Sequence, residues 1–205
     1  RDVVRNLLAC SSRYWQDGDR SSLIDSNRQV FEDSFAEFRA FLQGLLPDED
    51  WERFAKSLHV DYSRFRNLWM KQFQNIPQAH RRYPPDVCWH VIRSYIKGMS
   101  ADDDLEPDDY LTIELKQRSV TSETFKEVYE RVWTAWYKDY CHVEKLWDDQ
   151  DLARYLLSEN LVKPVFPAIF CDESQDFTRL ELEVILRMSL FSDKLVPPHE
   201  IRLIP

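Results

Sequence analysis

Two adjacent carboxylates, Asp172 and Glu173, directly follow a short apolar run that has no helical period. That run, residues 165–171, predicts a buried strand of the kind found in parallel sheets. In open α/β sheets, ligands bind at the carboxyl ends of the strands. One carboxylate there can hold Mg²⁺ and the other can orient or deprotonate a water, while the Gln175 amide can bond a phosphate. The spacing therefore indicates nucleotide hydrolysis.

A plain acidic turn between a strand and a helix is the alternative, because carboxylates also stabilise a helix N-terminus. The residues after the acids predict such a helix. Thr178 and Glu181 match a capping box, and an apolar helical stripe runs on to Met188. Residues 201–204 then read as the beginning of a second strand. The order strand, acidic turn, helix, strand predicts one βαβ unit.

Glycine is scarce, with only three residues of this type in 205. They allow neither a G-x-x-x-x-G-K-[ST] loop nor a G-x-G-x-x-G loop. Any phosphate cradle must therefore come from outside this chain. The chain begins at Arg1 and stops just after a new apolar run begins, so we interpret it as a fragment. The remainder of the same polypeptide is then its first partner.

The part of the chain before the acid pair is predicted to be helical. Apolar residues recur at helical spacing over 31–46, 51–58, 65–73, 87–96 and 121–140, and Gly98 is a plausible helix C-terminal cap. The aromatic stripe of 121–140 is typical of a core, with base stacking as the alternative. The acidic segment 102–109 is interpreted as solvated surface, with a cation site as the alternative.

Charge and cysteine content further limit the kinds of binding site and the cellular compartment that the sequence allows. The net charge of −9 excludes a basic footprint over the whole domain, but it leaves room for a local patch. The four cysteines are far apart, which disfavours zinc and a disulfide scaffold. No apolar stretch reaches the length of a membrane span, and no signal peptide is visible. We expect an intracellular protein with no membrane segment.

The string Ile169-Phe170-Cys171-Asp172-Glu173-Ser174-Gln175-Asp176-Phe177-Thr178 resembles motif II, the Walker B box, of the UvrD/Rep-type superfamily 1 DNA helicases. Upstream, 129–133 and 146–152 resemble the segment that precedes motif II in that family. Residues 91–98 are similar to the divergent branch found in large helicase-like proteins with tetratricopeptide and ankyrin repeats.

The resemblance implies a mainly α fold with two parts. Residues 1–160 correspond to the family's helical insertion subdomain, and 161–205 to a partial RecA-like, P-loop NTPase βαβ segment. In the family's pattern, Asp172 resembles the Mg²⁺-binding acid, acting through water, and Glu173 the catalytic base. Gln175 resembles the residue that couples the γ-phosphate to the DNA-binding elements. These three residues form a partial ATP site, so the cofactors implied are ATP and Mg²⁺.

The resemblance also implies a nucleic-acid partner. The family's helical insertion lies over single-stranded or forked DNA and touches phosphates, and RNA remains open. Candidate contacts here are Lys71, Arg81, Arg82, Lys116 and Arg118, with ordinary solvated side chains as the alternative.

Three functions are compatible with these patterns. The first is an ATP-dependent helicase that moves along single-stranded nucleic acid, of which this fragment alone is inactive because it lacks the phosphate loop. The second is a catalytically silent helicase-like scaffold module in a large interaction protein. The third, a helical-bundle metal enzyme, is disfavoured because the chain contains no E-x-x-H pair.

Overall fold

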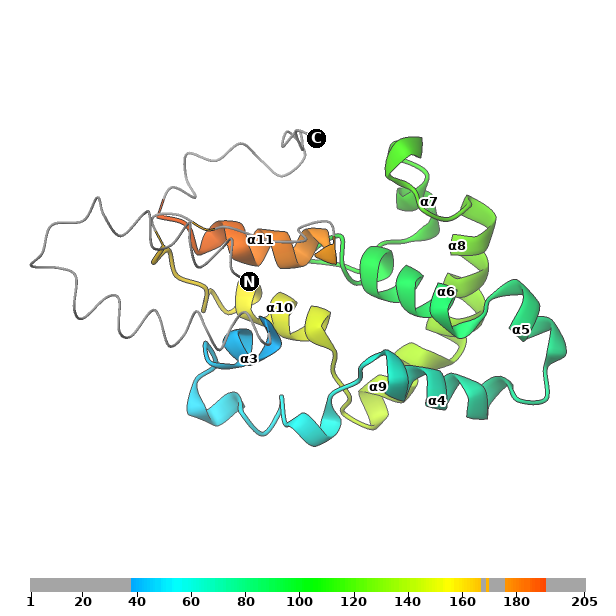
Figure 1. Cartoon of the computed structure of the whole chain (residues 1–205), viewed down its shortest axis with the longest axis horizontal. Helices are drawn as coiled ribbons and strands as arrows, with labels where there is room; N and C mark the ends of the chain where they lie inside the picture. The colour runs from blue at the N-terminus through cyan, green and yellow to red at the C-terminus, as the bar shows by residue number, and fades with distance from the viewer. Residues whose placement is uncertain (1–37, 167–168, 170–175, 191–205) are drawn as a thin grey trace, which may run out of the picture.

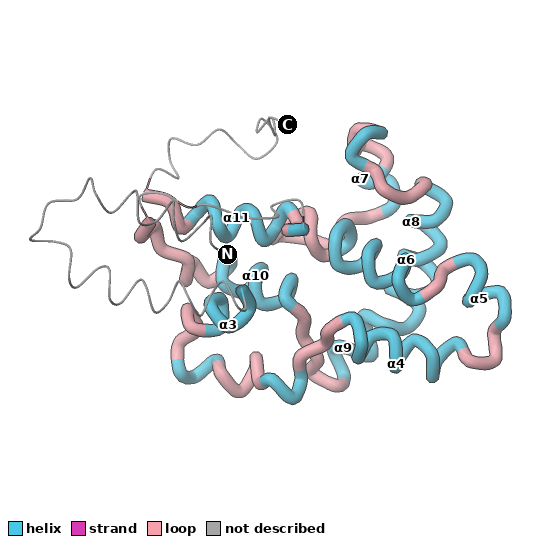
Figure 2. Tube along the Cα trace, in the orientation of Figure 1, coloured by secondary structure: helices cyan, strands magenta, loops and turns pink. Residues whose placement is uncertain are grey.

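Helices dominate the computed structural model, which describes residues 38–166, 169 and 176–190 (Figures 1 and 2). In chain order the elements are α3 (Phe38–Gln43), η2 (Asp48–Asp50), η3 (Lys56–Leu58), α4 (Tyr62–Phe73), α5 (Pro77–Arg82), α6 (Pro85–His90), η4 (Val91–Ile96), α7 (Pro107–Tyr110), η5 (Leu115–Gln117), α8 (Ser122–Val128), η6 (Tyr129–Tyr137), α9 (Lys138–Val143), α10 (Asp149–Ser158) and α11 (Arg179–Arg187). The π-helical segment η4 continues α6, and the π-helical segment η6 joins α8 to α9.

Local sequence signals account for where these helices begin. Prolines occupy the first turn of α5, α6 and α7, where a missing N–H breaks no intrahelical bond. The side chains of Asp61 and Thr121 accept hydrogen bonds from backbone N–H groups at the starts of α4 and α8. Helices α10 and α11 both begin with a complete capping box, which satisfies two backbone donors at once.

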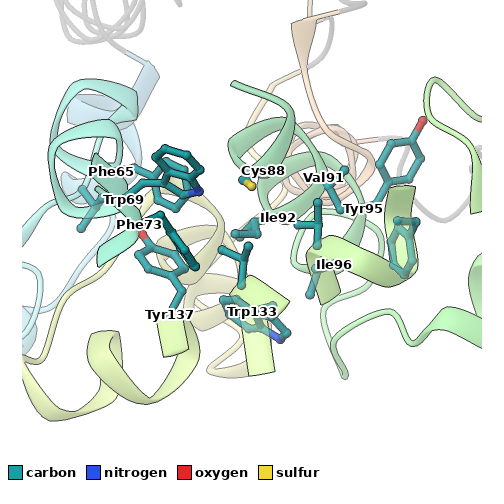
Figure 3. Close-up of a cluster of buried hydrophobic side chains, with 14 of the residues drawn as sticks. Phe65, Trp69, Phe73, Cys88, Val91, Ile92, Tyr95, Ile96, Trp133 and Tyr137 are labelled. Carbon is teal, nitrogen blue, oxygen red and sulfur yellow. The ribbon is translucent and has the colours of Figure 1, made fainter. Parts of the chain in front are cut away.

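The larger hydrophobic cluster joins α4, α6, η4, α8 and η6 (Figure 3). Phe65, Trp69 and Phe73 follow one another at helical spacing along α4 and are buried. The rings of Phe65 and Tyr137 pack edge-to-face, with their centroids 4.9 Å apart, so the long helix α8–η6–α9 packs across α4. The stripe of 121–140 is therefore core, as predicted, and the interpretation of 87–96 as a buried helix face is also confirmed.

A second hydrophobic cluster joins α3, α10 and α11, which lie together at the other end of the molecule (Figure 1). Leu152 and Leu156 of α10 and Leu180 and Val184 of α11 are fully buried in it. The predicted division of the chain at residue 160 therefore separates two helices that share one core.

The βαβ unit falls largely on residues outside the described ranges. Its helix is present as α11, with the predicted cap. Of the predicted first strand, the described residues include Phe166, which forms a parallel bridge with Ser189 after α11. The only other bridge between described residues joins His59 to Trp147, and no longer strand occurs among them. The second strand, 201–204, lies outside the described ranges.

Two local predictions were wrong. Residues 51–58 form turns and the short η3 instead of an α-helix, because the backbone of Ala55 is extended. Its carbonyl accepts hydrogen bonds from both the Leu58 N–H and Trp147 Nε1, each at 2.9 Å. Gly98 does follow a helix, but its φ is not positive, so it is not a left-handed cap. Its missing side chain instead leaves space for Thr178.

The acidic segment 102–109 is only partly a solvated surface. Asp104 is half-buried, and its carboxylate bonds Lys138 at 2.9 Å and Arg154 at 3.0 Å, which ties the segment to α9 and α10. Within the described part of the chain, no helix is long and apolar enough to cross a membrane.

Candidate functional site

The structure describes the residues that follow the predicted acid pair, but not the acid pair itself. Asp172, Glu173 and Gln175 lie outside the described residues, which resume at Asp176. Thr178, only three positions beyond Gln175, is 4% exposed and begins α11. The contacts that hold this helix start therefore fix the point from which the chain leads back to the acids.

The capping box of α11 is buried. The Thr178 N–H donates to Glu181 Oε2 at 2.7 Å, and the Glu181 N–H donates to Thr178 Oγ1 at 3.2 Å. Glu181 is 2% exposed. A buried carboxylate requires a cationic or hydrogen-bonding partner, because an unpaired charge there is strongly destabilising.

Arg93 of η4 is that partner. Its Nη2 donates to both carboxylate oxygens of Glu181, at 2.9 and 3.0 Å, and its Nη1 donates to the carbonyl of Asp176 at 3.4 Å. A guanidinium that contacts both oxygens fixes orientation as well as distance. Arg93 thus ties η4 to Asp176, just before the start of α11, and to Glu181 in its first turn.

Gly98, just beyond η4, brings the two segments into direct contact. Its carbonyl accepts a hydrogen bond from the Leu180 N–H at 2.9 Å. A Cβ at this position would lie 2.9 Å from Thr178 Cβ and would collide with the carbonyl oxygen of Arg93. Only glycine lets the backbone approach the start of α11 this closely.

A third segment reaches Thr178 from α10. Thr178 Oγ1 donates to Gln150 Oε1 at 2.7 Å, and Gln150 is 1% exposed. Gln150 is held in turn by the α10 capping box, because its own N–H donates to Asp148 Oδ1 at 2.9 Å. The Gln150 Nε2 group is buried without a hydrogen-bond partner.

Lys97 anchors the α10 capping box from the end of η4. Its Nζ lies 2.6 Å from Asp148 Oδ2 and 2.6 Å from Asp151 Oδ2, and its side chain is 6% exposed. Burial alone would lower the pKa of Lys97, but Asp148 and Asp151 outweigh burial and raise it. Burial and the neighbouring Asp151 raise the pKa of Asp148 to about 6, against the opposing effect of Lys97. One buried cation thus faces two carboxylates.

We call this set of side chains the polar clamp, formed by Arg93, Lys97, Asp148, Gln150, Asp151, Thr178 and Glu181. It joins η4, α10 and α11, which lie far apart in the sequence. Its charged groups are paired with one another, and these pairs join the starts of α10 and α11 to the end of η4.

Sequence reasoning did not predict that the residues of the polar clamp come together. Arg93 and Lys97 appeared only inside the stretch 91–98, and Gln150 carried no assignment. The signal available was a lysine directly after the apolar stripe that ends at Ile96. A lysine in this position is usually solvated. Nothing local indicates that its carboxylate partners lie more than fifty residues away.

The structure does not gather the five basic candidates on one element. Lys71 and Arg81 are exposed, on α4 and α5 respectively. Arg82, also on α5, pairs with Glu127 of α8 at 3.1 Å. Lys116 pairs with its neighbour Glu114 at 2.7 Å, and both side chains are largely exposed.

Arg118 is bound within its own loop. Its guanidinium donates to the carbonyls of Leu111 at 2.6 Å and Ile113 at 2.8 Å, and lies over the Tyr110 ring at 5.6 Å. These bonds close the connection between α7 and α8. Lys71 and Arg81 are thus the two candidates that are exposed and form no ion pair with another described residue.

Comparison of the chain with protein families, with curated proteins and with solved structures found no match.

Proposed function

We propose that this chain is part of an ATP-dependent superfamily 1 helicase or translocase of the UvrD/Rep type. The observation that carries the proposal is the polar clamp. The stretches 91–98 and 146–152 and the string that ends at Thr178 were each singled out by their resemblance to that family. All three contribute side chains to one buried cluster. Resembling positions that meet in space are expected when one site constrains them.

The acid pair supplies the chemistry in this proposal. Asp172 and Glu173 offer the carboxylate oxygens that Mg²⁺ prefers. Bound Mg²⁺ would neutralise charge that develops on the phosphates of ATP. With ATP bound, Glu173 would accept a proton from the water that attacks the γ-phosphate, with ADP as the leaving group, and Gln175 would couple the γ-phosphate to the nucleic-acid-binding part. The phosphate cradle comes from the remainder of the polypeptide.

Single-stranded or forked DNA is the proposed track. The exposed cations Lys71 and Arg81 project from helices of the segment that corresponds to the family's insertion. Contacts to phosphates carry no sequence information, as a translocating protein requires.

The proposal is tested by ATP hydrolysis in the full-length protein, with and without single-stranded DNA. We expect DNA-stimulated hydrolysis that is abolished in Glu173→Gln. Glu183→Gln, on α11 and away from the clamp, is the matched control and should hydrolyse ATP like the wild type. A full-length protein that does not hydrolyse ATP under any of these conditions contradicts the proposal and favours the silent scaffold.

A further inference from the structure

We propose that residues 60–146 form a separate cooperative unit, which we call the insert, and that a polar latch joins it to the rest of the described chain while allowing the two to move relative to each other. The rest, which we call the base, comprises the described residues of 38–58 and 147–190. This inference does not depend on the proposed function. It rests on the two hydrophobic cores, on the points where the chain crosses between them, and on the bonds that join them.

The two hydrophobic clusters divide the chain at two points. The buried residues of the larger cluster all lie within 60–146, and those of the second cluster lie within 42–54 and 147–188. Among the described residues, no buried side chain belongs to both clusters. Of the half-buried side chains, Leu58 borders both clusters, and Ala101 of the insert packs against the base. The insert therefore has a core of its own, beside that of α3, α10 and α11 (Figure 1).

The chain enters and leaves the insert at adjacent points. The Val60 N–H donates to the Trp147 carbonyl at 2.8 Å, and the Trp147 N–H donates to the Leu58 carbonyl at 3.3 Å. His59 and Trp147 accordingly form a parallel bridge. A hinge needs only a few residues at the ends of elements to absorb the change in backbone angles. Because the two crossings lie side by side, the insert can turn about this point without stretching the chain.

Away from this crossing, the insert and the base are joined by a set of polar bonds that we call the latch. Its contacts are Lys97 with Asp148 and Asp151, both at 2.6 Å, Arg93 with Glu181 at 2.9 Å, Arg154 with Asp104 at 3.0 Å, and the Leu180 N–H with the Gly98 carbonyl at 2.9 Å. Arg154 of the base also donates to the carbonyls of Lys97 and Ser100, at 3.2 and 3.3 Å. The latch thus holds residues 93–104 of the insert against α10 and the start of α11.

Ion pairs of this kind fix one closed orientation but make separation less costly than an apolar interface would. Buried ions lose hydration when the two units close, and this loss offsets much of the attraction between the ions. When the units part, water solvates the ions again, whereas separated apolar surfaces gain nothing from water. Polar interfaces between units of one chain accordingly accompany relative motion. The chemistry of the latch therefore favours a closed state that can open.

Opening of the latch moves exposed cations with the insert. Lys71 and Arg81 both belong to the insert, on α4 and α5, whereas α10 and α11 belong to the base. A rotation at the crossing therefore changes where these two cations lie relative to α10 and α11. A polyanion bound to them would move with the insert.

The first test asks whether the two units unfold separately, by hydrogen exchange of the full-length protein under native conditions. Leu156→Ala leaves a cavity in the base core and Val132→Ala one in the insert core, since both side chains are fully buried. We expect Leu156→Ala to speed exchange in α10 and α11 on the order of tenfold or more, with α4 and η6 within about twofold of the wild type. Val132→Ala should show the opposite pattern. Equal acceleration in both units by either variant overturns the division.

The second test weakens the latch at one point and measures hydrogen exchange at another. Arg154→Met removes the side-chain bonds of α10 to residues 97–104. The Leu180 N–H lies in the first turn of α11, where helical N–H groups lack a partner in their own helix, and it bonds the Gly98 carbonyl of the insert instead. Its exchange therefore reports separation of the two units.

We expect Arg154→Met to speed exchange at the Leu180 N–H on the order of tenfold or more, with α4 and η6 within about twofold of the wild type. Arg187→Met is the matched control, because the ion pair of Arg187 stays within α11, and it should leave exchange at Leu180 unchanged. Wild-type exchange at Leu180 in Arg154→Met overturns the latch. An equal rise throughout α4 and η6 also overturns it, since the chain would then open as one body.

Discussion

The hydroxyl of Thr178 donates a hydrogen bond to the side-chain oxygen of Gln150 across 2.7 Å, with both residues almost completely buried. This bond links the N-caps of two helices, because Thr178 caps α11 and Gln150 is held by the cap of α10. The end of the motif string is thereby fastened to the helical part of the chain. The first two predictions concern the energetics of this junction.

Thr178→Ala should destabilise the chain by about 1–3 kcal/mol, because it removes a helix cap and leaves the Gln150 amide without the only side chain that bonds it among the described residues. Thr178→Ser, which keeps the hydroxyl, should lose much less. Urea unfolding of the variants measures both effects. Thr134→Ala is the control, since the Thr134 hydroxyl is exposed and bonds only carbonyls of its own helix. If Thr178→Ala and Thr134→Ala lower the free energy of unfolding equally, the bond between Thr178 and Gln150 does not stabilise the fold.

Lys97→Met should be far more damaging, by about 3–5 kcal/mol, because it leaves the Asp148 carboxylate buried without its cation. Adding Asp148→Asn should recover part of the loss, since asparagine still caps a helix but carries no charge. A double-mutant cycle on unfolding free energies measures this coupling. Lys126→Met, in an exposed pair with Glu130, should change stability by less than about 0.5 kcal/mol. Strict additivity at Lys97 and Asp148 would contradict the observed pairing.

Gly98→Ala should destabilise the chain by about 1–3 kcal/mol, since the new methyl group meets Thr178 Cβ and the Arg93 carbonyl. Hydrogen exchange should become faster at the Leu180 N–H, which bonds the Gly98 carbonyl. Gly44→Ala is the matched control, because Gly44 is exposed and has no positive φ. If Gly98→Ala is tolerated as well as Gly44→Ala, the close approach of the two segments is wrong.

Acid should weaken the junction between α3 and α10 through Asp149. Burial alone would raise the pKa of this carboxyl, but hydrogen bonds from His59 and Arg39 outweigh burial and lower it to about 2. Because the folded pKa lies below the unfolded value of about 3.9, the stabilisation is complete above about pH 5. It is lost as the pH falls from about 5 through the folded pKa of about 2.

Asp149→Asn lacks this titration, so the stability difference between wild type and variant should shrink over the same interval. Unfolding free energies measured in steps from about pH 6 to about pH 2 test this. A difference that stays constant over the whole interval would show that Asp149 is not paired as described.

Among the basic candidates, Lys71 and Arg81 should contribute to DNA binding, whereas Arg118 should contribute to stability. Lys71→Glu with Arg81→Glu should weaken binding of single-stranded DNA and reduce its salt dependence, by about 0.7 in the log–log slope for each phosphate that the protein no longer neutralises. Arg118→Lys should leave DNA affinity unchanged but destabilise the loop whose carbonyls it bonds. Fluorescence anisotropy at several salt concentrations, beside unfolding curves, separates the two. If Arg118→Lys lowers DNA affinity more than the change of Lys71 and Arg81 to glutamate does, the assignment of these residues is wrong.

Much of the helical fold follows from local signals in the sequence. The apolar stripes of 87–96 and 121–140 indicated buried helix faces, and Thr178 with Glu181 indicated the capped start of α11. These predictions were correct because period and capping act over a few residues. Residues 51–58 were mispredicted because Ala55 has an extended backbone, and its carbonyl accepts a hydrogen bond from the distant Trp147 Nε1 that no local pattern indicates.

The surroundings of the candidate site were harder to predict, because they depend on contacts between residues that are distant in the sequence. Asp172, Glu173 and Gln175 were predicted from their position after an apolar run and lie outside the described residues, whereas the side chains around Thr178 come together through tertiary contacts. In the sequence Lys97 has the features of a solvated lysine, but in the structure it is buried and pairs with Asp148 and Asp151 at the start of α10. Gly98 looks like a helix cap until the proximity of Thr178 shows that the backbone needs the space.

The most direct test of the central claim compares ATP binding with ATP hydrolysis in full-length Glu173→Gln. If Glu173 is the base beside a Mg²⁺-binding Asp172, the variant should bind ATP within a fewfold of the wild-type affinity. It should hydrolyse ATP at least on the order of a hundredfold more slowly. Hydrolysis by Glu173→Gln at the wild-type rate would contradict the claim that this acid pair is half of an ATP site.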